Sequence, residues 1–194
     1  MASPHDHDHE HDPSCAVAHG HTDAVAHGHS AASADDKILV AVFATPVARF
    51  LLRYAAECGY RAVLMEPDPA RAEAARAFGA ELVSSMDEFE PGIADVVVTD
   101  HHRDELGIPL RDALAAKARW VGIMGNPRHE GPHLKALAEL GMPADEISKV
   151  HRPIGLNIGS RTPPEIAIST LAGLIADHNG RPGGFSYPAV ASVS

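Results

Sequence analysis

Lysine and arginine are missing from the first 36 residues of this 194-residue chain, which hold seven of its 26 acidic residues. From residue 37 onward the acidic residues exceed the 16 basic ones by only three, so the body has little net charge. A protein that binds the phosphate backbone of a nucleic acid needs a basic surface. The charge distribution therefore argues against a nucleic-acid partner.

Cysteine and long apolar runs are also scarce. The two cysteines are Cys15, in a low-complexity segment, and Cys58, in a predicted helix, so they form no disulfide framework and indicate a reducing compartment. No basic start is followed by the apolar run of a signal peptide, and the apolar runs elsewhere are too short to span a bilayer. We expect a soluble cytoplasmic protein with no membrane partner.

Large apolar residues are almost absent before residue 37, where His, Asp, Ala, Gly and Ser dominate. Such a segment buries too little apolar surface to offset the entropy of ordering, so we expect residues 1–36 to form a disordered tail. Residues 37–180 alternate short apolar runs with helical patterns and are expected to form one domain. Residues 181–194 show no periodicity and are expected to form a C-terminal tail.

Histidine is abundant in the N-terminal tail, where many of the residues alternate with Asp or Gly. Imidazoles two residues apart on a flexible chain can close round one ion such as Zn or Ni. A solvated extension without a role remains the alternative interpretation. The candidate metal ligands are His5, His7, His9, His11, His19, His21, His27 and His29.

From residue 37 the pattern is that of an α/β protein. Strands are expected at 38–43, 61–66, 81–84, 95–99 and 120–124. Helices are expected at 46–58, 69–78, 105–118, 133–140, 143–149 and 164–177. Strands that alternate with helices imply right-handed crossovers, so we predict a Rossmann-like, doubly wound, mostly parallel sheet.

Several polar residues follow the predicted strands and therefore reach the carboxyl edge of the sheet, where open α/β sheets bind ligands. Glu66 lies about 20 residues after the first turn, a distance that suits hydrogen bonding to a ribose diol. An NAD(P)-binding protein or NAD(P)-dependent oxidoreductase is therefore one hypothesis. The candidates at this edge are Thr45, Glu66, His101, His102, Asn126 and Arg128.

The first turn, Phe43-Ala44-Thr45-Pro46, contains no glycine. A dinucleotide fingerprint needs glycines so that backbone N–H groups can approach a pyrophosphate. Here Thr45 is predicted to cap a helix that begins with Pro46, which has no N–H. The turn is expected to keep the scaffold of a nucleotide site without its phosphate cradle.

A glycine-punctuated loop precedes the last predicted helix. Thr162 and Glu165 fit a capping box with proline at the first helical position. Exposed N–H groups, a helix N-terminus and an arginine together suit an anion, although the capping box alone explains Thr162 and Glu165. The candidate ligand-binding residues of this loop are Gly155, Asn157, Gly159, Ser160, Arg161 and Thr162.

The segment HRPIGLNIGSRTPPEIAIS, residues 151–169, resembles the run H-x-P-I-G-L-D-I-G-x-x-T-P-x-E-I-A-x-S of the xanthine dehydrogenase accessory factor (XdhC/CoxI) family. The segment WVGIMGN, residues 120–126, is similar to the family's Y-[IV]-G-x-[IM]-G-S strand. The likeness covers roughly residues 37–180, the Rossmann-like domain of the family. Departures are the glycine-free first turn, Asn157 in place of Asp, and Asn126 in place of Ser.

The resemblance implies a maturation factor for a molybdenum hydroxylase such as xanthine or carbon monoxide dehydrogenase. Such a protein would bind molybdenum cofactor, protect it while a cysteine desulfurase exchanges an oxo ligand for sulfur, and pass it to the apoenzyme. NAD(P) binding and metal handling by the tail remain the alternatives. No nucleophile with a placed base is found, which favours an accessory protein over an enzyme. The oligomeric state is left open, a homodimer included.

Overall fold

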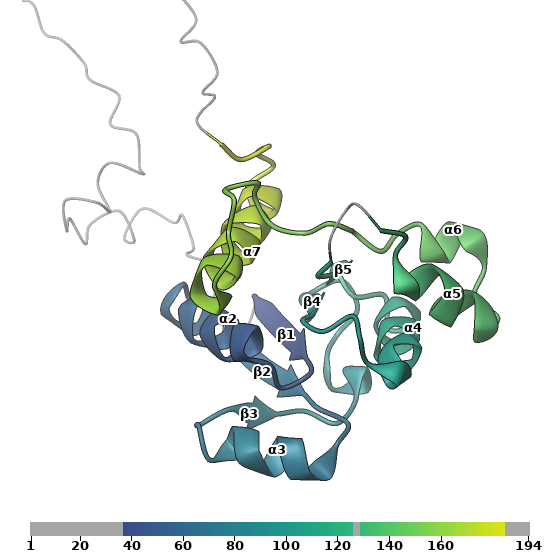
Figure 1. Cartoon of the computed structure of the whole chain (residues 1–194), viewed down its shortest axis with the longest axis horizontal. Helices are drawn as coiled ribbons and strands as arrows, with labels where there is room; N and C mark the ends of the chain where they lie inside the picture. Colours follow the sequence, from purple (N-terminus) through teal and green to yellow (C-terminus); the bar gives the residue numbers. More distant parts are fainter. Residues whose placement is uncertain (1–36, 126–128, 185–194) are drawn as a thin grey trace, which may run out of the picture. The chain divides into compact units, whose positions relative to one another are not determined.

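The computed structural model describes residues 37–125 and 129–184, which build a five-stranded, all-parallel sheet (Figure 1). Its order, β3-β2-β1-β4-β5, is Rossmann-like and confirms the predicted fold class. The tail 1–36 lies outside the described residues. The strands are β1 (Ile38–Val42), β2 (Arg61–Met65), β3 (Glu81–Leu82), β4 (Ala94–Val98) and β5 (Trp120–Ile123).

Helices cover both faces of this sheet. On one face α2 and α7 lie side by side, with Ala75 of α3 in the same core; on the other, the core is closed by α4, α5 and α6 (Figure 1). No helix among the described residues is long and apolar enough to cross a membrane. The helices are α2 (Pro46–Glu57), α3 (Pro69–Arg76), α4 (Gly107–Ala115), α5 (Pro132–Glu139), α6 (Ala144–Ile147) and α7 (Pro163–His178), with 3₁₀ turns η3 (Met86–Glu88) and η4 (Asp104–Leu106).

The central strand β1 shows why the sequence is apolar at every position. Ile38, Val40 and Val42 point into the core beneath α4 and α5, whereas Leu39 and Ala41 point into the core beneath α2 and α7. A parallel sheet covered on both faces needs apolar side chains on both. All five residues are buried, as the continuous apolar run predicted.

Local boundaries differ from the predictions at three places. The helix expected at 105–118 is a 3₁₀ turn followed by α4, because Pro109 has no N–H and is tolerated only in the first turn of an α-helix. β3 has two residues, and α6 is a single turn. An unpredicted one-residue bridge places His151 parallel to Gly122, on the outer side of β5.

A buried charge network ties the last turn of α7 to the amino edge of the sheet. Asp95 of β4 is fully buried and accepts from Arg119 Nε at 2.5 Å, and its other oxygen lies 2.7 Å from His178 Nε2. Arg119 also donates through Nη1 to Asp177 at 2.6 Å. Nearby, burial raises the pKa of Tyr60 to about 12, with the Asp95 carboxylate adding to the effect. The C-terminal end of α7 is therefore anchored by charges as well as by apolar packing.

Candidate functional site

The turn between β1 and α2 forms as predicted, with Thr45 as the cap and Pro46 as the first helical residue. Thr45 Oγ1 accepts from Ala48 N at 3.0 Å and donates to Thr99 Oγ1 at 2.9 Å. Thr99 follows β4, so this bond joins the two strands where the direction of strand order reverses. The crevice in which an open α/β sheet binds a nucleotide is bridged here by two threonines.

Glu66 reaches the same edge, but its carboxylate faces the protein. One oxygen accepts from Ala44 N at 2.7 Å, and the other accepts from Asp68 N at 2.9 Å and from Arg103 Nη2 at 3.2 Å. The Glu66 side chain is fully buried. The carboxylate thus takes the place of an external anion at the backbone of the first turn.

Arg103 completes this closed arrangement. Its guanidinium lies 4.6 Å from the centre of the Phe43 ring and bonds to Glu105 as well as to Glu66. The hydrogen bond from Arg103 holds the pKa of Glu105 below its usual range. Two acidic residues therefore neutralise one arginine beside the first turn, and neither Glu66 oxygen is left without a donor.

Two histidines follow β4. The rings of His101 and His102 lie 4.0 Å apart between centroids, and His102 N donates to Asp100 Oδ1 at 2.9 Å. Partial burial lowers the pKa of His101, and the neighbouring His102 and Arg152 act in the same direction. The sequence prediction of two histidines at this edge therefore corresponds to one pair of rings in contact, tilted by 39°, with Arg152 close by.

Arg152 enters the edge from the chain that follows the His151 bridge. Its guanidinium packs on Gly125, two residues after the end of β5, since a Cβ on Gly125 would lie 2.7 Å from Arg152 Nε. Arg152 Nη1 donates to His129 O at 2.9 Å. Arg152 was not among the sequence-predicted site residues. Arg152 directly follows His151, which pairs with β5. This pairing would have placed Arg152 at the edge, but it is visible only in the folded structure.

His133, near the start of α5, was also not predicted. Its side chain is 5% exposed, and Nδ1 has no hydrogen-bond partner among the described residues. A Cβ on Gly131 would lie 2.3 Å from the His133 ring, so only glycine leaves room for it. Burial lowers the pKa of His133, and the Arg152 charge lowers it further. We call His101, His102, His133 and Arg152 the edge cluster.

The loop before α7 lacks the free backbone N–H groups that an anion site needs at the start of this helix. Glu165 accepts from Arg161 N at 2.8 Å and from Thr162 N at 3.0 Å, and the next two residues are prolines without N–H groups. These hydrogen bonds lower the pKa of Glu165. The side chains at this helix end are otherwise solvent-facing: Asn157, Arg161 and Thr162 are exposed, and Ser160 is half-buried.

Gly155 and Gly159, in the same loop, both have positive φ angles but differ in their surroundings. Gly155 lies against α7, where Leu156 N donates to Ser169 O at 3.0 Å and Ser169 Oγ donates to Leu156 O at 2.6 Å. Gly159 lies in open space. Gly155 therefore serves packing of the loop on the helix.

Other predicted residues cannot be placed. Asn126 and Arg128 lie outside the described residues, as do all eight predicted metal-binding histidines of the N-terminal tail. Within residues 37–125 and 129–184, no group of three or more His, Cys, Asp or Glu side chains is arranged to hold a metal ion. The metal hypothesis therefore depends entirely on the tail.

The buried His133 makes stability sensitive to acid. Its folded-state pKa lies below the usual 6.5, so unfolded His133 takes up a proton in a pH range where the folded form does not. The corresponding stability is present above pH 6.5 and is lost as pH falls toward the folded-state pKa. When the pH is lowered from 7.5 to 5, the unfolding free energy of the wild type should fall further than that of His133→Leu. The difference should be about 1.4 kcal/mol for each pH unit by which folding lowers the pKa of His133.

Urea unfolding at several pH values measures this effect. His102→Gln, at an exposed position, is the matched control and should keep the acid sensitivity of the wild type. Equal pH dependence in the wild type and His133→Leu would mean that His133 is not buried in its neutral form.

Three comparisons place the chain among known proteins. Residues 39–174 match the family model described as the XdhC Rossmann domain. The uncharacterized protein YqeB of Escherichia coli is 33% identical over 110 residues, which are 57% of this chain and 19% of that protein. A crystal structure of a xanthine dehydrogenase from Bacillus halodurans matches with a TM-score of 0.59 and 23% identity, over 75% of this chain and 45% of that one.

The two relatives are much longer than the matched part. The chain spans about a fifth of YqeB and under half of the Bacillus protein. At 23% identity the structural likeness shows a shared fold, and fold alone does not define an activity.

Proposed function

The chain belongs to the XdhC family, and from that membership we propose that it is a non-catalytic maturation factor for a molybdenum hydroxylase of the xanthine or carbon monoxide dehydrogenase type. It would bind molybdenum cofactor, an anionic pterin phosphate, and hand it to the apoenzyme. A cysteine desulfurase that sulfurates the cofactor would be the second partner. The family supports the general link to xanthine dehydrogenase, and the edge cluster supports the binding step.

The proposed position of the ligand rests on one observation. Arg152 lies at the carboxyl end of β5, close enough to His101 and His133 for its charge to lower the pKa values of both. An anionic phosphate needs N–H donors and positive charge. Arg152 supplies a permanent charge, and the buried His133 Nδ1 is a polar atom without a partner among the described residues. These groups fit an anion better than the start of α7, where Glu165 already binds two N–H groups.

The lowered pKa values of His101 and His133 suit a carrier. Both imidazoles are neutral at pH 7 before the ligand arrives, because their pKa values lie below the usual 6.5. An arriving anion favours the protonated imidazole, so binding draws in protons and release returns them. The residues bind and orient, and none is required to break a bond. The cofactor supplies its redox chemistry in the client enzyme.

The NAD(P) alternative finds less support. A ribose needs a free carboxylate and a pyrophosphate needs free N–H groups in the first turn, but Glu66 and Ala44 bond to each other. Pro46 offers no N–H, and the Thr45–Thr99 hydrogen bond bridges the crevice. The metal-handling alternative rests on the tail histidines, for which the fold gives no argument.

The experiment is to incubate the purified protein, under anaerobic conditions, with molybdenum cofactor released from a molybdoenzyme. Retained molybdenum and pterin are measured after gel filtration, and transfer is measured as activity regained by an apo-hydroxylase. We expect Arg152→Met, which keeps the apolar stem, to weaken binding about tenfold or more because one charge-assisted hydrogen bond is lost.

Arg161→Met is the matched control, because Arg161 is the arginine of the alternative site before α7. It should change the affinity less than about twofold. Loss of binding in Arg161→Met alone would move the ligand to that loop. Absence of retained pterin in the wild type, with no transfer, would reject the proposed function.

A further inference from the structure

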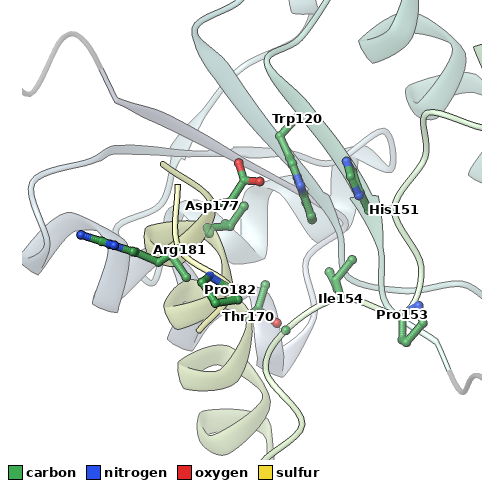
Figure 2. Close-up of a pocket in the computed structure, with 12 residues that line it drawn as sticks. Trp120, His151, Pro153, Ile154, Thr170, Asp177, Arg181 and Pro182 are labelled. Atoms are coloured by element: carbon green, nitrogen blue, oxygen red, sulfur yellow. The ribbon is translucent and has the colours of Figure 1, made fainter. Parts of the chain in front are cut away.

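A cavity lies at the amino edge of the sheet, at the opposite end of β5 from the edge cluster. It has a volume of about 240 Å³, is open to solvent on one side, and is lined by the start of β5, the chain after the His151 bridge, the C-terminal half of α7 and residues 181–182 (Figure 2). Arg152 follows the lining residue His151 in the chain, but its guanidinium packs on Gly125, which lies roughly 15 Å along the strand direction from Trp120 at about 3.3 Å per residue. The cavity therefore does not belong to the site proposed above.

Trp120 forms one wall of this cavity. One face of its ring stacks on His151, with centroids 4.9 Å apart and planes 6° from parallel. Thr170, Asp177 and Pro182 lie on the other side of the Trp120 ring from His151 (Figure 2). The second aromatic face is therefore turned toward the cavity.

The position of the Trp120 ring is fixed by a glycine. A Cβ on Gly122 would lie 2.2 Å from Trp120 Cη2 and 2.8 Å from Ile154 Cγ2. The edge of the ring therefore leans over residue 122, at a position that any side chain on this residue would block. An aromatic platform held on one face and open on the other is suited to stacking a flat ring.

The floor of the cavity is formed by the backbone of two glycines. Gly155 and Gly173 both line the cavity, and a Cβ on Gly173 would lie 3.3 Å from Gly155 Cα. Because neither residue carries a side chain, the space between Trp120 and α7 stays open. The volume is below the 300–1,000 Å³ typical of drug-sized ligands, so it suits a single heterocycle rather than a dinucleotide.

Asp177 provides a polar group at the wall. Its Oδ2 accepts from Arg119, whereas Oδ1 accepts no side-chain hydrogen bond from the described residues. A carboxylate oxygen beside an aromatic face accepts N–H groups from the edge of a stacked base. The wall thus selects for a ring that carries N–H donors.

We propose that this cavity binds a flat nitrogen heterocycle, stacked on Trp120, whose edge N–H donors bond to Asp177. Guanine is the best-matched base because it presents two adjacent N–H donor groups on one edge. The site holds the base alone, and the phosphate-binding part of a nucleotide is not required for it. The inference is independent of the proposed function, since it uses none of the residues of the edge cluster.

The chain carries its own reporter for this site, because Trp120 is its only tryptophan. Guanosine is titrated into the full-length protein with excitation at 295 nm, and N-acetyltryptophanamide is titrated in parallel to correct for absorption. We expect saturable quenching with a Kd below about 1 mM. Inosine, which lacks the 2-amino group, should bind several-fold more weakly. Quenching that does not saturate would overturn the proposal, and equal binding of inosine would overturn the role of Asp177.

Two alanines of α7 give a matched pair of variants. Ala176 lines the cavity and Ala172 does not, although both are half-buried on the same helix. Ala176→Leu fills the space beside Trp120 and should abolish guanosine quenching, whereas Ala172→Leu should leave it within about twofold of the wild type. The thermal midpoint of each variant verifies folding. Retained quenching in a folded Ala176→Leu protein would place the ligand elsewhere.

Discussion

Gly155→Ala is expected to lose about 3 kcal/mol of unfolding free energy, from the strain of a side chain at positive φ together with overpacking against α7. Gly155 has φ +85°, and a Cβ there would lie 2.5 Å from Ser169 Oγ and 3.1 Å from the backbone at Ser169 and Thr170. A helix backbone cannot move aside as a flexible side chain can. The loop must therefore lift from α7, breaking its two hydrogen bonds to Ser169.

Gly159→Ala separates strain from the clash. Gly159 has a similar φ of +70°, but no atom lies within 4 Å of its Cβ position. Only the cost of a side chain at positive φ remains for Gly159→Ala, so we expect it to lose about 1–2 kcal/mol of unfolding free energy. Urea unfolding with a common m value measures both variants. Equal losses would show that the packing of residue 155 on α7 contributes nothing to stability.

Glu66→Gln is expected to destabilise the protein by about 3 kcal/mol, because a neutral amide replaces a buried carboxylate that pairs with Arg103 and accepts from two backbone N–H groups. The amide keeps the volume of the side chain, but its NH₂ group would face either Ala44 N–H or Asp68 N–H, two donors that need an acceptor. Arg103 would also lose one of its two carboxylate partners. The first turn, β2 and the loop after β4 lose their common anchor.

Glu105→Gln is the control for Glu66→Gln, since Glu105 contacts the same arginine from a half-exposed position. Its loss should stay below about 1 kcal/mol, as for other exposed ion pairs. The measurement is again the urea midpoint, with the far-ultraviolet spectrum as a test of fold. A Glu66→Gln protein as stable as Glu105→Gln would mean that the buried carboxylate is not an anchor.

Much of the fold follows from local signals in the sequence. The apolar run of β1 predicts a strand buried on both faces, and Thr45-Pro46 predicts the start of α2, because each depends on neighbours only a few residues away. The alternation of strands and helices predicts the parallel sheet, since each crossover is right-handed. The bridge at His151 was not predicted, because one paired residue leaves no periodic pattern.

The candidate site was less predictable because it depends on where side chains point. Glu66 lies at the position expected for a ribose-binding acid, yet its direction is set by Ala44 N–H and by Arg103, 37 residues away. Arg152 and His133 come together only through the path of the chain after β5. Spacing in the sequence predicts which edge a residue reaches, but not which partner it meets there.

The anchoring of α7 bears on how the chain is made. This helix closes the core shared with α2, which lies more than 100 residues earlier, and its last turn joins Asp95 through His178. During synthesis, α2 covers only part of this face of the sheet, and the rest stays uncovered until residue 178 has left the ribosome. Long-range closure of this kind slows folding and leaves apolar strands exposed to other nascent chains meanwhile. The protein thus depends on α7 to leave the aggregation-prone stage of its folding.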